Sequence, residues 1–163
     1  MRITLVGKSA ISTIYRLAKE TWINTYVSII GIEQVNYMLQ LFYSEEVLAK
    51  QMDSGGYYFI LICHNNDPIG FASWSLTANN AYKLHKLYVL PRVQGSGAGS
   101  NMIKYIINHI KTLNGNLLTL NVNRQNQTAI RFYYKQGFTL AYNEDIDIGQ
   151  GFFMNDHVMQ MHI

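Results

Sequence analysis

This chain has few cysteines and prolines, and no stretch long or apolar enough to cross a membrane. Its 163 residues include one cysteine and two prolines. The cysteine, Cys63, lies in the apolar run Tyr57–Cys63, so we expect it in the core, and a single cysteine excludes an internal disulfide or a cysteine metal site. That run is far shorter than the roughly 20 residues of a membrane span. Lys8, Arg16 and Lys19 interrupt any signal-peptide core, so we expect a cytoplasmic protein with no membrane partner.

Acidic residues are missing from the middle of the chain. No Asp or Glu occurs between Pro68 and Asn143, although the net charge is only +3. The basic residues of this segment are Lys83, Lys86, Arg92, Lys104, Lys111, Arg124, Arg131 and Lys135. A positive half suits a polyanionic ligand such as a nucleotide, and an acidic remainder suits a cationic substrate. Because the basic residues are scattered and no nucleic-acid motif occurs, we do not expect a nucleic-acid partner.

Hydrophobic residues make up 48% of the chain, which is enough for one core, and no repeat or linker divides it, so we predict a single domain over residues 1–163.

The first third of the chain predicts a short strand and three helices. The strand covers residues 2–6, and the first helix is capped by Ser9 or Ser12 and runs to about Thr25. Gly31 separates it from a second helix, and Ser44 caps a third that ends at residues 55–56.

The remaining chain predicts mainly strands. Apolar, β-prone stretches cover residues 57–64, 69–76, 84–90 and 117–122, with turns at residues 65–68 and 79–80. Beyond Pro91, a helix is indicated by apolar residues at helical spacing, namely Met102, Ile103, Ile106, Ile107 and Ile110.

A glycine-rich turn joins that strand to that helix. Its sequence is Gln94-Gly95-Ser96-Gly97-Ala98-Gly99. Glycines at the start of a helix let backbone N–H groups approach a ligand, and the helix N-terminus favours negative charge, so the turn can hold phosphate. A P-loop is excluded because no lysine precedes Ser100. A dinucleotide-binding fingerprint is excluded because the turn lacks the G-x-x-G spacing and no acidic residue follows about 20 residues later.

The pattern that remains, Q-x-x-G-x-G at Gln94, Gly97 and Gly99, resembles the GNAT superfamily of N-acetyltransferases. A second segment, residues 126–138, reads NQTAIRFYYKQGF and resembles the family's segment after the fifth strand. Physically it is a short helix capped by Asn126, with Gly137 as its C-terminal stop. Two matching segments in the right order make the resemblance specific over residues 57–138.

The resemblance implies a fold and a donor site. The fold is an α/β, mixed and mostly antiparallel sheet of about six or seven strands flanked by about four helices, with the fourth and fifth strands splayed apart. Acetyl-CoA is the implied cosubstrate, with no metal. The residues implied to bind it are Leu87, Val89, Arg92, Gln94, Gly95, Ser96, Gly97, Ala98, Gly99, Ser100 and Asn126.

The implied reaction is direct attack of a primary amine on the thioester in a ternary complex. The resemblance implies that Tyr133 lies near the thioester sulfur and protonates the departing thiolate. The neighbouring Tyr134 is the alternative residue for this role. The general base is open. His85, which alternation places on the same strand face as Leu87 and Val89, is one candidate, and proton removal through water is another.

Acceptor recognition is expected from the N-terminal helices and the last hairpin. Trp22 and Tyr26 lie one helical turn apart and can sandwich an amine. Carboxylates in an expected loop over residues 144–151 can select a cation, and the C-terminal segment resembles members that act on polyamines. A small cationic amine such as a polyamine is therefore the predicted substrate. Acetylation of protein N-termini or lysines, a non-catalytic acyl-CoA-binding module and a homodimer remain open.

Overall fold

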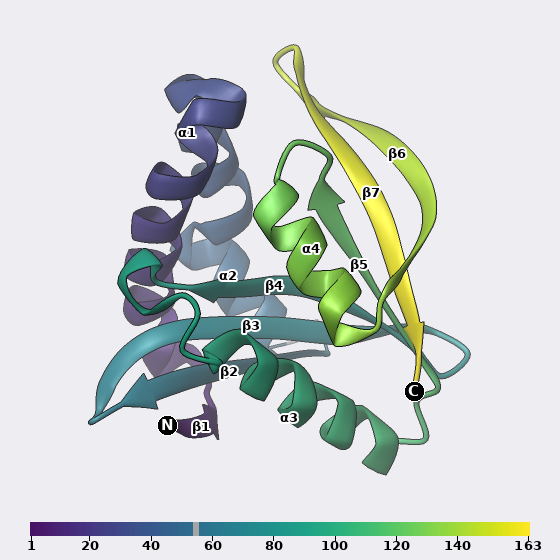
Figure 1. Cartoon of the computed structure of the whole chain (residues 1–163). Coiled ribbons are helices and arrows are strands. Elements are labelled where there is room, and N and C mark those ends of the chain that lie inside the picture. The colour runs from purple at the N-terminus through teal and green to yellow at the C-terminus, as the bar shows by residue number, and fades with distance from the viewer. Residues whose placement is uncertain (54–55) are drawn as a thin grey trace.

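The computed structural model describes residues 1–53 and 56–163, and Figure 1 shows a central sheet with helices on both faces. Its strands are β1 Arg2–Leu5, β2 Tyr57–His64, β3 Asp67–Ala78, β4 Ala81–Val89, β5 Leu117–Asn123, β6 Thr139–Gly149 and β7 Phe152–His162. Its helices are α1 Ile11–Tyr43, α2 Glu45–Asp53, α3 Ala98–Thr112 and α4 Gln127–Gln136, with 3-10 turns at Lys8–Ala10 and Pro91–Val93.

The described residues form one 7-stranded sheet in the order β1-β2-β3-β4-β5-β7-β6. All neighbouring strands are antiparallel except β4 and β5, which are parallel. This arrangement confirms the predicted mixed, mostly antiparallel sheet and its flanking helices.

The strands β4 and β5 separate partway along their length. Their pairing runs from Ala81 opposite Leu117 to Leu84 opposite Leu120, whereas the strands continue to Val89 and Asn123. Figure 1 shows the two strands diverging beneath α4. Backbone groups of β4 beyond Leu84 therefore lack β5 as a partner and are available to a ligand on that side. The predicted splaying of the fourth and fifth strands is confirmed.

Each face of the sheet has its own apolar core. Because side chains alternate along a strand, β2 sends Ile60 and Ile62 toward α3 and α4, and Phe59 and Leu61 toward α1 and α2. Burial on both faces explains the continuous apolar run of β2, in which Cys63 is buried as predicted. The α3 stripe is also confirmed, since Met102, Ile103, Ile106 and Ile110 are buried and Ile107 packs against the same core.

A β-bulge interrupts the pairing of β3 with β4. Trp74 pairs with Leu84 and Ser73 pairs with Lys86, so His85 is the extra residue. The bulge exchanges the faces of the residues that follow it. Leu84 points to the α3 face before it, and Leu87 points to that same face after it.

The prediction that His85 shares a face with Leu87 and Val89 is therefore wrong. Leu87 and Val89 pack against the core beneath α3. His85 instead contacts Ser75, 2.8 Å from its Nε2, and the ring of Tyr57, which packs on the α1 side. Simple alternation fails because the bulge adds one residue to β4.

The N-terminal helices differ in detail from the prediction. The helix α1 continues beyond Thr25 and is interrupted at Gly31, whose φ of 80° and ψ of 160° are not helical, so the predicted break at this glycine is confirmed. Neither Ser9 nor Ser12 caps it, because the preceding 3-10 turn leads directly into the helix at Ala10. Ser44 does cap α2, with its Oγ accepting from the Val47 N–H at 3.4 Å. The helix α2 is described to Asp53, and of its predicted end at residues 55–56, residue 55 lies outside the described residues.

The acidic segment near the C-terminus is a strand rather than a loop. The strand β6 extends to Gly149, and only Gln150 and Gly151 form the turn. Isoleucines alternate with the carboxylates here, which is the pattern of a strand with one apolar face. Asp145 pairs with Arg124, so this carboxylate already has a partner on the surface.

Candidate active site

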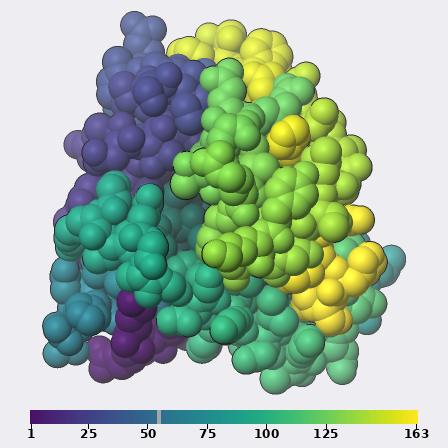
Figure 2. All heavy atoms as spheres, viewed as in Figure 1, coloured from purple at the N-terminus to yellow at the C-terminus, as the bar shows by residue number. Residues whose placement is uncertain are grey.

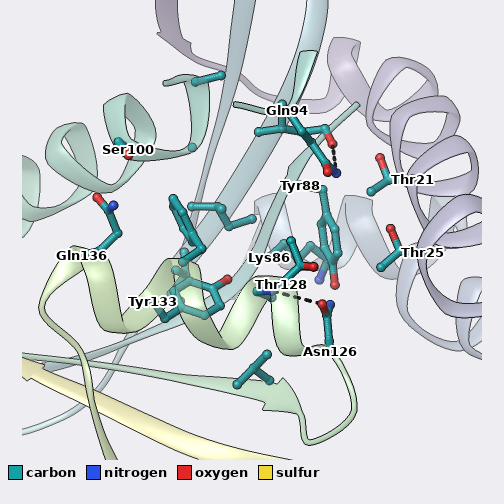
Figure 3. Close-up of a pocket in the computed structure, with 18 of the residues that line it drawn as sticks. Thr21, Thr25, Lys86, Tyr88, Gln94, Ser100, Asn126, Thr128, Tyr133 and Gln136 are labelled. Carbon is teal, nitrogen blue, oxygen red and sulfur yellow. Dashed lines mark hydrogen bonds between the residues drawn. The ribbon is translucent and has the colours of Figure 1, made fainter. Parts of the chain in front are cut away.

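A cavity of about 790 Å³ occupies the gap between β4 and β5. The helix α1, the glycine-rich turn before α3, and α4 enclose it, and Figure 2 shows the surface hollowed between these segments. In the close-up of Figure 3, Lys86 and Tyr88 of β4 lie between Tyr133 of α4 and Thr21 and Thr25 of α1. The cavity therefore lies where the sheet opens.

The glycine-rich turn forms one wall of this cavity. Gly95 and Gly97 have φ angles of +82° and +84°, a left-handed conformation that favours glycine. Gly97 is the N-cap of α3. The first N–H groups of α3 have no carbonyl partner inside the helix, and the positive end of its dipole faces the same region. This wall therefore suits an anionic group such as phosphate.

Gly99, the third glycine of the turn, has a packing role as well. A Cβ at Gly99 would lie 3.1 Å from Cζ of Phe132 on α4. Glycine at this position thus lets α4 approach the start of α3 closely. Both helices border the cavity, so Gly99 helps to set its width.

The structure brings most of the predicted donor-binding residues to the cavity. The lining includes Leu87, Val89, Gln94, Gly95, Gly97, Ala98, Gly99, Ser100 and Asn126. Arg92 and Ser96 are not among the lining residues. The Arg92 guanidinium is instead ion-paired with Asp67 at 2.8 Å, with both side chains about half exposed.

Asn126 already has two partners in this structure. Its Oδ1 accepts from the Ala129 N–H at 3.1 Å, which confirms the predicted cap of α4. Its Nδ2 donates to the Tyr26 hydroxyl at 3.3 Å. A second amide hydrogen remains for a ligand.

The two tyrosines of α4 have opposite surroundings. Tyr133 lines the cavity and is only 8% exposed, with its ring against Phe132 and Phe138. Burial raises the pKa of Tyr133, and the nearby Tyr26 raises it further. Tyr134 is 50% exposed and is not part of the lining. Of these two tyrosines, only Tyr133 is therefore placed to donate a hydrogen bond into the cavity.

A second cavity of about 360 Å³ lies on the α1 side of the same gap. The two cavities share a wall made of Tyr26, Leu84, His85, Lys86, Tyr88 and Asn121. Of the predicted acceptor-binding residues, Tyr26 lines both cavities, whereas Trp22 lines only the second and is largely buried. Their ring centroids are 4.9 Å apart. Two molecules bound in the two cavities would meet at the shared wall.

His85 is part of that shared wall but is a weak base. Its Nε2 lies 2.8 Å from the Ser75 hydroxyl. Burial lowers its pKa to about 4, with further contributions from Lys86 and Lys83. The imidazole is therefore neutral at neutral pH.

Two further charged residues of the second cavity were not singled out from the sequence. Lys86 is 6% exposed, and burial lowers its pKa to about 8. Asp156 is 4% exposed and accepts a hydrogen bond from Asn121 at 3.3 Å, and its pKa is raised chiefly by burial. The sequence offered little signal, because Lys86 is one of two lysines on β4 and Asp156 lies among the polar residues Asn155 and His157 on β7. Asp156 was missed because only the sheet order places β7 beside β5.

Within residues 1–53 and 56–163, no group of three or more His, Cys, Asp or Glu residues is placed to hold a metal ion. Of the helices formed by these residues, none is both long and apolar enough to cross a membrane.

Comparison with known proteins gives a family and two kinds of relative. Residues 27–153 match the family model of an acetyltransferase (GNAT) domain. A spermidine N(1)-acetyltransferase of Thermoplasma acidophilum is 28% identical over 148 residues, which cover 88% of this chain and 89% of the relative. A peptidyl-lysine N-acetyltransferase, YjaB of Salmonella typhimurium, is 33% identical over 89 residues, or 55% of this chain and 54% of the relative.

A solved structure extends the similarity to the whole chain. The PaiA N-acetyltransferase of Thermoplasma acidophilum, crystallised in complex with coenzyme A, has a TM-score of 0.84 and 25% identity, with 100% of both chains covered.

Proposed function

This chain belongs to the acetyltransferase (GNAT) family, and from that membership we propose that it acetylates a small cationic amine such as a polyamine. It is an N-acetyltransferase that uses acetyl-CoA. We propose direct attack of the amine in a ternary complex, carried out by residues 1–163 as a single domain. The observation that carries this proposal is the pair of cavities that meet where β4 and β5 separate.

We place acetyl-CoA in the larger cavity. Acetyl-CoA supplies an activated acetyl group and a thiol leaving group. The residues present fit it, because Gly95 and Gly97 leave open space beside backbone N–H groups and the N-terminus of α3 suits a pyrophosphate. The backbone of Leu87 and Val89, free of β5, would bind the pantetheine amides. The related PaiA structure holds coenzyme A, which supports this assignment.

We place the acceptor amine in the smaller cavity. Its lining includes the aromatic residues Trp22, Tyr26, Tyr43 and Tyr57, which can stabilise a cation over their rings. Asp156 is the one carboxylate among the described residues that line it. A buried carboxylate can accept several hydrogen bonds, and an ammonium group supplies the donors that it needs. These features and the spermidine acetyltransferase relative favour a cationic acceptor.

Tyr133 is proposed to donate a hydrogen bond to the departing thiolate. It lies in the larger cavity, and its raised pKa keeps the hydroxyl protonated. A backbone N–H of the splayed part of β4 is the proposed donor to the oxyanion. His85 lines both cavities but is not proposed as the general base. A group with a pKa of about 4 is poorly suited to remove a proton from an alkylammonium.

The test is release of CoA thiol from acetyl-CoA in the presence of polyamines, amino sugars, amino acids and peptides. Polyamines are expected to support turnover. Asp156→Asn should raise the KM for the polyamine by about 10-fold or more, because it removes a charge-assisted hydrogen bond. Asp145→Asn, which changes a surface carboxylate paired with Arg124, should leave KM unchanged.

Other outcomes would identify the alternatives. Turnover with lysine peptides alone would favour peptidyl-lysine acetylation, the activity named for the YjaB relative. Binding of acetyl-CoA without turnover of any amine would favour a non-catalytic acyl-CoA-binding module. Either result would contradict the proposal.

A further inference from the structure

Lys86 is a buried cation without an anionic partner. Its Nζ donates a hydrogen bond to Oε1 of Gln51 at 3.3 Å and lies 5.1 Å from the ring centroid of Tyr43. No carboxylate in the described part of the chain forms an ion pair with it. Lysine is seldom buried without a paired charge, because burial disfavours the ammonium form. The position therefore favours a lysine that readily gives up its proton.

The β-bulge directs this lysine to the acceptor cavity. Leu84 points to the α3 face, so regular alternation would send Lys86 to that face as well. The extra residue His85 reverses the alternation, and the Lys86 side chain instead reaches Tyr43 of α1 and Gln51 of α2. Bulges beside active sites commonly re-aim a side chain in this way. Lys86 also lies in the wall shared with the larger cavity.

We propose that Lys86 is the general base that removes the proton from the acceptor ammonium. This inference rests on the proposed function. The neutral Nζ accepts one proton from the ammonium nitrogen, and the free amine then attacks the thioester carbonyl. A C–N bond forms, the C–S bond breaks, and a second proton from the amine nitrogen ends on the CoA thiol. Lys86 then returns its proton to solvent, so one ammonium and one thioester yield one amide, one thiol and one proton.

The alternatives in the cavity are less well matched to an amine with a pKa near 10.4. Proton transfer to His85, with a pKa of about 4, is unfavourable by roughly a million-fold. Transfer to Lys86, with a pKa of about 8, is unfavourable by only a few hundred-fold. A cationic acceptor beside Lys86 also favours the neutral lysine, because like charges repel.

Titratable groups from several elements face the smaller cavity together with Lys86. These groups are Lys83, His85 and Tyr88 on β4, Tyr26 and Tyr43 on α1, Tyr57 on β2 and Asp156 on β7, while α2 contributes the uncharged Gln51. The tyrosines Tyr26, Tyr43 and Tyr88 have raised pKa values, chiefly through burial, and remain neutral. Asp156 is placed to hold the cationic acceptor, so Lys86 is left to receive its proton.

The experiment is the pH dependence of kcat/KM for a polyamine with wild type, Lys86→Met and Lys86→Arg. Wild type should show a rise that levels near pH 8, where Lys86 becomes neutral. Both variants should have a kcat about 100-fold lower near neutral pH, since general-base catalysis contributes at least this factor. Their pH profiles should also lack the rise that levels near pH 8. The exposed Lys104→Met should retain the wild-type profile.

Direct titration of the Lys86 side chain by NMR gives a readout that does not depend on turnover. The lysine should titrate near pH 8 in the wild-type protein, and acetyl-CoA should bind both variants with unchanged affinity. Lys86→Met should fold, because it replaces a buried charge with an apolar chain of similar length. If Lys86→Met nevertheless fails to fold, the Lys86→Arg variant and the NMR titration still test whether Lys86 is the general base.

Three results would overturn the proposal. The first is a Lys86→Arg enzyme with wild-type activity, which would mean that only the positive charge matters. The second is an unchanged pH profile in Lys86→Met. The third is a Lys86 that itself carries an acetyl group by mass spectrometry after incubation with acetyl-CoA, which would make it an acceptor. Absence of turnover with every amine would instead count against the proposed function.

Discussion

At the scale of single residues, the adjacent tyrosines of α4 provide a matched pair. Tyr133→Phe removes a buried hydroxyl in the larger cavity, and Tyr134→Phe removes an exposed one. We expect Tyr133→Phe to lower kcat by about 100-fold, because it removes the proposed proton donor. Affinity for acetyl-CoA by calorimetry should be unchanged. Equal losses in both variants would contradict a specific role for Tyr133.

Gly70 lies on β3 against the backbone of Tyr88 and Val89 on β4. A Cβ there would lie 2.6 Å from the carbonyl oxygen of Tyr88, which is backbone and cannot rotate away. Gly70→Ala should therefore lower the free energy of unfolding by about 1–3 kcal/mol. Gly7→Ala is the control, because a Cβ there meets nothing within 4 Å. Chemical denaturation of the two variants measures the difference, and equal stabilities would contradict the prediction.

At the scale of elements, α4 depends on its N-cap. Asn126→Ala removes the hydrogen bond to the Ala129 N–H and the donor to the Tyr26 hydroxyl. We expect a loss of about 1 kcal/mol from the cap and a further ~1 kcal/mol from the buried hydroxyl. Asn126→Ser keeps a capping oxygen, so it should recover the first contribution only. Thermal and denaturant unfolding of the two variants would separate the contribution of the cap from that of the Tyr26 hydroxyl. An Asn126→Ser variant as unstable as Asn126→Ala would argue against capping.

The bulge in β4 decides which of its side chains line the smaller cavity. It places His85 and Lys86 on the face of α1, away from Leu87 and Val89. Leu87 and Val89 therefore line the larger cavity alone, whereas His85 and Lys86 line both cavities. With acetyl-CoA and the amine in the proposed cavities, this arrangement would let the two substrates meet through the gap beside β5.

At the scale of the whole molecule, His85 makes stability depend on pH. Its pKa is about 4 in the folded protein and 6.5 for an unperturbed histidine. Between these values the unfolded chain binds more protons, so His85 stabilises the fold above pH 6.5 and this contribution is lost as pH falls toward 4. The full effect is at most about 3 kcal/mol.

The corresponding measurement is the Tm of wild type and His85→Gln across that range. Wild type should lose more stability on acidification than His85→Gln does, whereas His64→Gln, at an exposed site, should behave like wild type. Asp156 acts in the opposite direction, because its raised pKa favours folding at low pH. It is present in all three proteins and cancels in the comparison. Curves of Tm against pH that run parallel for wild type and His85→Gln would refute the assignment of this pH dependence to His85.

The sequence by itself determined the features that depend on neighbouring residues. The glycines of the turn at Gly95 and Gly97, the cap at Asn126 and the apolar stripe of α3 follow from local conformational preferences and spacing. The order of two such segments was enough to predict the family and the splayed sheet. Each of these features is encoded within a few residues.

Only the tertiary structure decided which residues line the smaller cavity. The bulge at His85 exists because β4 pairs with β3, and Asp156 reaches the gap because β7 pairs with β5. Tyr26 meets Asn126 across 100 residues of sequence. The buried state that lowers the pKa of Lys86 depends on α1 and α2, which supply Tyr43 and Gln51 from earlier in the chain. Such contacts are set by packing between distant segments, which spacing along one strand or helix does not encode.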